Sequence, residues 1–162
     1  MPKKDFYVNQ SVKDKDELLY IMKNAVTLEL HVEDFEPVRD FYKKIGFEIL
    51  FDSPGNYLTI RHDKVILSFW GDGGRFKDQP YFKNFPADTK KGFAVEIRIP
   101  VDDIDGMWEK VKNIAEVKTP LKEKRWGARD FRVLDVNGFY LCFTEKHDWI
   151  FNFGGYSTDK DD

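Results

Sequence analysis

The sequence predicts an α+β fold made of two βαβββ modules that follow one another along the chain. The pattern of one strand, one helix and three further strands occurs twice, on either side of a long connection. Each predicted helix follows an aspartate suited to an N-cap, and these two residues, Asp34 and Asp103, are 69 positions apart. The last strands of the two halves begin near Val65 and Phe139, 74 positions apart. This similar spacing indicates an internal duplication.

Composition narrows the class of protein. A chain of 162 residues with 41% hydrophobic and 34% charged residues is typical of one globular domain with a buried core. A net charge of −3 favours no nucleic-acid partner, and no apolar run approaches the roughly 20 residues of a membrane helix. A single cysteine excludes an intramolecular disulfide. Met1–Lys4 contains no apolar signal segment, so we expect a cytoplasmic protein.

Residues 1–24 are predicted to be an N-terminal helical extension. Ser11 together with Asp14 can cap a helix that continues through Glu17–Met22, where apolar residues gather on one side. The sequence leaves open whether this helix packs on the core or on a partner subunit.

The first module is assigned to residues 25–70. Val26, Leu28, Leu30 and Val32 alternate with polar residues and predict a strand. A helix with an apolar stripe follows Asp34, carries a proline in its first turn and ends at a glycine. Three further strands are expected over 47–52, 57–61 and 65–70.

Residues 71–91 form a connection rich in glycine, proline and charge, and their aromatic residues favour docking over a free linker. The second module covers 92–145, with a strand at 93–99, a helix after Asp103, a short strand around Val117 and a closing hairpin. Residues 146–162 are an aromatic tail, and we expect one domain overall.

The closing hairpin has the clearest turn signal. Asn137-Gly138 lies between two alternating aromatic and β-branched runs, Phe131–Leu134 and Phe139–Thr144. Both turn residues tolerate positive φ, so the sequence predicts a two-residue type I′ turn.

Three segments carry a family resemblance: Asp40–Phe47, Gly55–Trp70 and the Trp126-Gly127 corner of the closing hairpin. Over about residues 25–145 the chain resembles the vicinal-oxygen-chelate superfamily, which contains glyoxalase I, extradiol dioxygenases and bleomycin resistance proteins. Within it, the chain is most similar to the bleomycin-resistance branch. The resemblance implies a curved sheet with a cleft inside and helices outside.

The resemblance also implies where a metal would bind. Metal-dependent members carry ligands on the first and last strands of both modules, and the matching residues here are Thr27, Ser68, Glu96 and Cys142. Only Glu96 is a routine ligand for a hard or borderline ion, whereas a catalytic ion needs about three good protein ligands. We therefore expect no metal or other cofactor.

Two alternative chemistries remain open. Glu29 and His31 share the strand face of Thr27, so a displaced metal site with Glu96 is conceivable, although a hydrogen-bonded strand histidine is the simpler interpretation. Cys142 would need a neighbouring base to act as a nucleophile, and the sequence indicates none.

In the bleomycin-resistance branch, the implied function is sequestration of a planar, aromatic, cationic small molecule in a groove at a homodimer interface. Aromatic stacking and acidic side chains suit such a ligand. Two other classes stay possible: a metal-dependent glyoxalase- or dioxygenase-like enzyme with an atypical ligand set, and a dimeric interaction module without a small ligand. The residues predicted to bind the ligand are Phe51, Asp52, Trp70, Glu96, Trp126 and Phe131.

Overall fold

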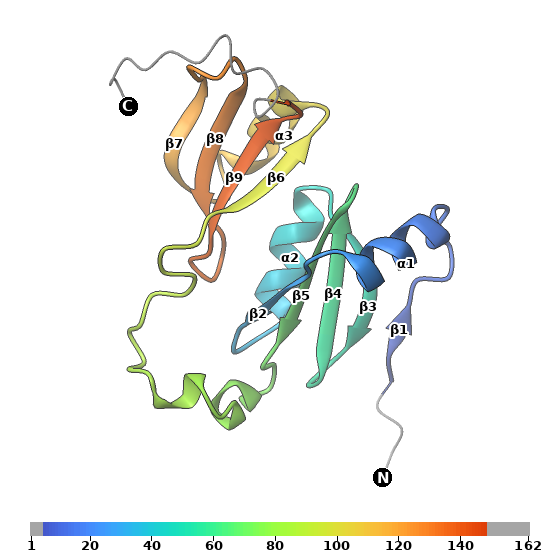
Figure 1. Cartoon of the computed structure of the whole chain (residues 1–162). Helices are drawn as coiled ribbons and strands as arrows, with labels where there is room; N and C mark the ends of the chain where they lie inside the picture. The colour runs from blue at the N-terminus through green and yellow to red at the C-terminus, as the bar shows by residue number, and fades with distance from the viewer. Residues whose placement is uncertain (1–4, 149–162) are drawn as a thin grey trace. The chain divides into compact units, whose positions relative to one another are not determined.

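A computed structural model of the chain describes residues 5–148 (Figure 1). The chain divides into two compact units, with the boundary between Thr89 and Lys90. Each unit contains one sheet.

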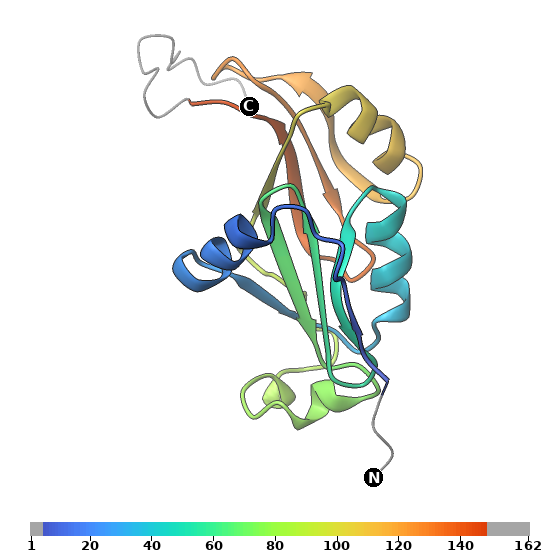
Figure 2. The same cartoon turned by 90° about the vertical axis from the view of Figure 1, so that its right-hand side faces the viewer.

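The first unit contains a five-stranded sheet, here called sheet 1, in the order β1-β3-β4-β5-β2. β2 runs parallel to β5, and the other neighbours are antiparallel. Helix α2 covers one face and α1 lies on the opposite side (Figure 2). The elements are β1 (Tyr7–Val8), α1 (Lys15–Asn24), β2 (Leu28–His31), α2 (Glu36–Lys44), β3 (Glu48–Ser53), β4 (Tyr57–His62), β5 (Val65–Trp70) and two 3-10 turns, η1 (Arg75–Asp78) and η2 (Phe82–Asn84).

The second unit contains a four-stranded sheet, here called sheet 2, in the order β6-β9-β8-β7. β6 is parallel to β9, and the remaining neighbours are antiparallel. Its elements are β6 (Ile97–Val101), α3 (Ile104–Val111), β7 (Glu116–Glu123), β8 (Arg129–Leu134) and β9 (Tyr140–Glu145).

The two sheets have the same strand register. Leu28 pairs with Leu67 in sheet 1, and Ile97 pairs with Leu141 in sheet 2. The paired positions are therefore 69 and 74 residues apart, which are the spacings that the sequence indicated. The predicted α+β fold of two βαβββ modules is confirmed.

Helix α2 is positioned by its own apolar stripe and by a distant aspartate. Val38, Phe41 and Tyr42 are buried, and the ring of Tyr42 contacts Phe69 of β5. The Asp72 carboxylate accepts hydrogen bonds from the backbone N–H of Phe35 at 2.9 Å and from that of Gly55. Asp72 thus satisfies a free N–H at the start of α2 and ties the helix to the β3–β4 turn.

Helix α3 begins as predicted. The Asp103 side chain accepts a hydrogen bond from the backbone N–H of Gly106 at 2.8 Å, as an N-cap should. Its buried residues, Ile104, Met107 and Val111, face sheet 2. At α2 the corresponding Asp34 lies one residue further out and accepts from Glu36 instead.

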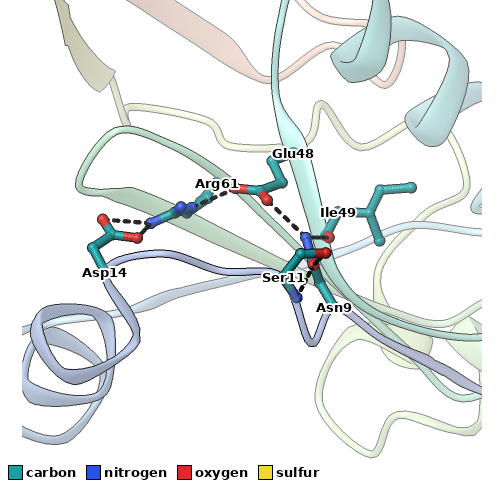
Figure 3. Close-up of polar contacts among 6 residues, drawn as sticks. All are labelled: Asn9, Ser11, Asp14, Glu48, Ile49 and Arg61. Atoms are coloured by element: carbon teal, nitrogen blue, oxygen red, sulfur yellow. Dashed lines mark hydrogen bonds and ion pairs between the residues drawn. The ribbon is translucent and has the colours of Figure 1, made fainter.

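The N-terminal extension packs on sheet 1. Leu18 of α1 is buried against Leu50 and Ile66. The Arg61 guanidinium bridges the carboxylates of Asp14 and Glu48 (Figure 3). β1 adds an edge strand to β3, which the sequence did not predict.

Both first strands are shorter at their N-terminal ends than the alternation predicted. β2 begins at Leu28, so Thr27 lies outside it, and Val26 is 93% exposed. β6 begins at Ile97, after an exposed Phe93 and an Ala94 with a φ of +61°. A positive φ at Ala94 interrupts extended backbone, which explains the late start of β6.

The closing hairpin turns differently from the prediction. The backbone N–H of Gly138 donates to the Asp135 carbonyl at 3.0 Å, and Asp135 pairs with Phe139 across a three-residue loop. The Asp135 carboxylate also accepts from the N–H groups of Asn137 and Phe139, both at 2.9 Å. Only Gly138 has a positive φ, +88°, so the predicted two-residue type I′ turn is wrong. The aspartate side chain stabilises the longer loop.

No helix among residues 5–148 is long and apolar enough to cross a membrane. The aromatic tail predicted from Trp149 onward lies outside the described residues.

Candidate functional site

The two sheets each have one face that does not contact the helix of their module. In β5, Phe69 packs on α2, so Ser68 and Trp70 point to the other side. In β9, Phe143 packs on Phe131, which contacts Trp108 of α3, so the neighbouring Cys142 points away from the helix. These two faces hold most of the predicted site residues.

A hydrogen-bonded carboxylate lies on this face of sheet 1. The Glu29 carboxylate accepts a hydrogen bond from the Tyr57 hydroxyl at 2.7 Å and lies 3.0 Å from His31 Nε2. Burial and the bond to Glu29 raise the pKa of Tyr57. The His31 ring packs against Trp70 of β5 and against Phe82 of η2, at centroid distances of 5.3 and 4.7 Å. The simpler interpretation of His31, a strand histidine beside a carboxylate, describes this geometry.

Phe82 belongs to the predicted connecting segment. Its contact with His31 confirms that aromatic residues of this segment dock on the first module. Tyr81 and Phe85 pack edge-on or tilted against Phe82 but stay largely exposed, at 64% and 45%.

The module-one positions that match family metal ligands make other contacts. Ser68 Oγ is 3.1 Å from Thr59 Oγ1 on the neighbouring strand, and both side chains are buried. Thr27 precedes β2 and is exposed. The residue opposite Ser68 in the ladder is Glu29, not Thr27.

The corresponding face of sheet 2 carries a chain of charges. Arg132 donates from Nε to Glu96 at 2.8 Å and from Nη1 to Asp130 at 2.7 Å. The Lys124 ammonium lies 3.7 Å from the same Asp130 carboxylate. The Asp130 side chain is completely buried, which makes it the most desolvated carboxylate of this chain of charges.

Cys142 lies beside this cluster, opposite Arg98 and Arg132 in the ladder. It is completely buried, and burial raises the pKa of its thiol to about 12. Because the thiolate is both the nucleophile and the metal ligand, this environment suits neither role. Among residues 5–148, no three His, Cys, Asp or Glu side chains are grouped so as to hold a metal ion.

The side chains of Phe51 and Asp52, which were predicted to form one corner of the site, lie on opposite faces of sheet 1. Asp52 lies on the α2 side, where Arg39 donates to both of its carboxylate oxygens at 2.6 and 2.7 Å. Phe51 pairs with Thr59 and contacts Phe6 of the extension, on the opposite side. Asp52 is therefore paired with Arg39, and its role as a partner for a cationic ligand stays a prediction.

The predicted tryptophans are both half-buried. Trp70 lies between His31 and the Arg75 guanidinium, which is 5.1 Å from its ring centroid. Trp126 lies in the β7–β8 turn, where Gly127 adopts a φ of +80° and donates its N–H to the Lys124 carbonyl at 2.8 Å. This glycine is needed because few other residues tolerate that backbone conformation.

Phe131 does not reach a ligand-accessible surface. It is fully buried between Trp108 and Phe143, with both ring centroids 5.1 Å away. The strand alternation turns this ring toward α3, and its predicted ligand contact stays untested.

Two residues of these faces were not predicted. Tyr57 and Asp130 occupy equivalent positions in the two modules. Tyr57 directly precedes Leu58, which pairs with Phe69. Asp130 directly precedes Phe131, which pairs with Phe143. An alignment of the two modules by their strand pairing would have identified Tyr57 and Asp130 as equivalent positions.

The chain was compared with known proteins. No protein-family model matches the sequence. Bleomycin resistance proteins of Geobacillus stearothermophilus and Staphylococcus aureus are each 26% identical to it over 125 residues, which cover 72% of this chain and 92% of theirs.

Solved structures share the fold. TioX from Micromonospora sp. ML1 superimposes with a TM-score of 0.58 at 22% identity, covering 74% of this chain and 96% of that protein. A bleomycin-binding protein in complex with bleomycin gives 0.53 at 16% identity, covering 76% and 99%. The chain therefore has the duplicated βαβββ fold of these solved structures. In sequence, the chain is similar to the bleomycin resistance proteins named above.

Proposed function

We propose that this protein is a non-catalytic small-molecule-binding protein that sequesters a planar, cationic ligand, as its bleomycin-resistance relatives suggest. The observation that carries the proposal is the sequence similarity along 92% of the length of a bleomycin resistance protein. On the first unit the proposed ligand contacts are Phe51 and Trp70, and on the second unit they are Glu96 and Trp126. A planar cation would gain from stacking on these rings and from nearby acidic side chains.

The chemistry of the two faces that lie opposite α2 and α3 supports binding over catalysis. Ser68 is hydrogen-bonded to Thr59, and the Cys142 thiol is held protonated by burial, so neither is prepared to ligate a metal or to attack a substrate. The acidic groups Glu29 and Glu96 are held in place by Tyr57 and Arg132. Glu29 lies beside the Tyr57 hydroxyl and the His31 ring, which packs against Trp70, and a fixed carboxylate near aromatic rings suits recognition of a cation.

Titration calorimetry with metal-free bleomycin tests the proposal. We expect saturable binding that weakens as salt is added, because charge attraction contributes to it and salt screens charge. A neutral oligosaccharide of similar mass is the control ligand and should give no saturable signal. Absence of bleomycin binding up to millimolar concentration would contradict the proposal and favour an interaction module without a small ligand.

We further propose a homodimer, in which the extension contributes to the interface. Several large apolar side chains of the first unit are exposed, and apolar patches of this kind mark interfaces. Light scattering at micromolar concentration should give a mass of two chains; the mass of one chain would contradict this part of the proposal. Within residues 5–26, the exposed large apolar residues are Phe6, Tyr7, Val8, Leu19, Tyr20, Met22 and Val26.

A further inference from the structure

The β7–β8 hairpin holds a lysine between an aromatic ring and a carboxylate. The Lys124 ammonium is 5.8 Å from the ring centroid of Trp126 and 3.7 Å from Asp130 Oδ1. The Lys124 side chain is only 8% exposed, although lysine is a residue that normally extends into water. The hairpin thus encloses a desolvated ammonium.

Asp130 is only partly satisfied by its neighbours. Its Oδ1 accepts a hydrogen bond from Arg132 at 2.7 Å and is the oxygen nearest to Lys124. Its buried Oδ2 accepts no hydrogen bond from the described residues. A fully buried carboxylate oxygen without a donor is costly, so this group would gain from a further N–H or O–H donor.

Trp126 has unused bonding capacity as well. Its indole N–H is buried and donates to none of the described residues. One face of its ring is taken by the Lys124 ammonium. An aromatic face beside a carboxylate is the arrangement by which proteins recognise cationic groups.

The charges of this cluster are balanced as they stand. Glu96 and Asp130 provide two negative charges, and Arg132 and Lys124 provide two positive charges. A cationic ligand added to this set would face like-charge repulsion in a poorly hydrated place. It would enter at lower cost if it replaced one of the two cations.

Of the two cations, Lys124 is the one that a cationic ligand would displace more easily. Arg132 is held by two hydrogen bonds of 2.7–2.8 Å to two carboxylates, whereas the 3.7 Å approach of Lys124 to Asp130 is longer than a hydrogen bond. The flexible lysine stem can also carry its ammonium out into water.

We propose that Trp126 and Asp130 form a binding site for a single ammonium or guanidinium group, and that the Lys124 ammonium occupies this site in the free protein. Ligand binding exchanges one cation for the other and releases Lys124 to solvent. The inference rests on the proposed function, because it identifies the chemical group of the ligand that this hairpin recognises.

The first experiment measures lysine reactivity in the wild-type protein. Reductive methylation followed by mass spectrometry is carried out with and without saturating metal-free bleomycin. Ligands usually protect lysines, but here the methylation rate of Lys124 should rise severalfold on binding, while that of the exposed Lys110 on α3 should stay constant. An unchanged or lower rate at Lys124 in the bound protein would overturn the inference.

The second experiment removes the internal cation. Lys124→Met should bind bleomycin about tenfold more tightly, since the ligand no longer displaces a competing ammonium. Lys110→Met removes the same charge on the helix side and should bind like the wild type. If wild type binds but Lys124→Met binds no better than Lys110→Met, this inference fails and the proposed function stands. If no variant binds, both fail.

Discussion

Arg61 donates from Nη1 to both carboxylate oxygens of Asp14, at 2.7 and 2.8 Å, and so fastens the start of α1 to the middle of sheet 1 (Figure 3). The same guanidinium donates from Nε to Glu48 at 2.7 Å. Glu48 in turn accepts a hydrogen bond from Asn9, which also reaches the Ile49 carbonyl. One arginine therefore joins both parts of the N-terminal extension, β1 and α1, to the module.

Replacing this arginine should release the extension. In Arg61→Met, the backbone amides of α1 should exchange hydrogen faster than in wild type, because Leu18 then remains as its main buried contact. Lys64→Met is the matched control: it removes an exposed ion pair with Glu17 and should change exchange little. Equal exchange rates in wild type and Arg61→Met would contradict the prediction.

The same contact predicts a pH dependence. The hydrogen bond from Arg61 holds the pKa of Asp14 below its usual value. A carboxyl with a lowered folded-state pKa stabilises the docked extension at pH values above its unfolded-state pKa, and this stabilisation is lost as the pH falls through the folded-state value. Protection of α1 should therefore be constant from neutral pH to about pH 5 and should decline only in stronger acid. Asp14→Asn should abolish this decline.

The internal duplication was predictable because it appears as local sequence patterns that occur twice along the chain. Hydrophobic alternation, the Asp103 cap and turn residues each act over a few positions, and their repetition revealed the 69- and 74-residue spacing that the ladders share. Such local patterns do not predict which residues far apart in the sequence contact one another. The pairing of Asp52 with Arg39 and the docking of β1 depend on the register across strands.

The sheet face that each candidate site residue takes was harder to predict, because adjacent strand residues face opposite sides. Phe51 and Asp52 are neighbours in sequence, yet one contacts the extension and the other contacts α2. A register irregularity between Ile49 and Phe51 further obscures which face each residue of β3 takes. The same alternation turns Phe131 toward Trp108 of α3. Trp126 lies in a turn, where this alternation does not apply.

The Cys142 thiol should be inert in the folded protein. Burial raises the pKa of this thiol to about 12, so almost none is thiolate at pH 8. Reaction with a disulfide reagent at pH 8 should be complete in denaturant and very slow without it. Because the folded-state pKa lies above that of the unfolded chain, the unfolded state loses its proton first, and stability should fall as the pH rises through about 9 to 12. Cys142→Ser is the control that abolishes the labelling; rapid labelling of the native protein would contradict the prediction.

The protein as purified, without added metal, should contain no stoichiometric zinc, nickel, iron or manganese. The positions that match the family's metal ligands carry Thr27, Ser68, Glu96 and Cys142. Ser68 is hydrogen-bonded to Thr59, and Glu96 accepts a hydrogen bond from Arg132. Elemental analysis checks this expectation. About one transition-metal ion per chain would instead support a metal-dependent enzyme that uses an atypical ligand set.

The last prediction contrasts a surface aromatic residue with a core one. Trp126→Ala removes a half-buried ring in a turn, so the fold should persist while bleomycin binding weakens by roughly five- to hundredfold, as for residues that dominate an interface. Phe131→Ala empties a fully buried site between Trp108 and Phe143 and should lower the free energy of unfolding by about 3–5 kcal/mol.

The loss of stability in Trp108→Ala should lie between those of Trp126→Ala and Phe131→Ala. Trp108 is half-buried, but its ring packs edge-on against Phe131 at a centroid distance of 5.1 Å. Calorimetric titration and thermal melting of the three variants separate the roles. Trp126 stacks on the ligand only if its loss affects the dissociation constant and leaves the melting temperature near that of wild type. Should Trp126→Ala melt as early as Phe131→Ala, Trp126 is a structural residue, and its part in the proposed binding site has to be abandoned.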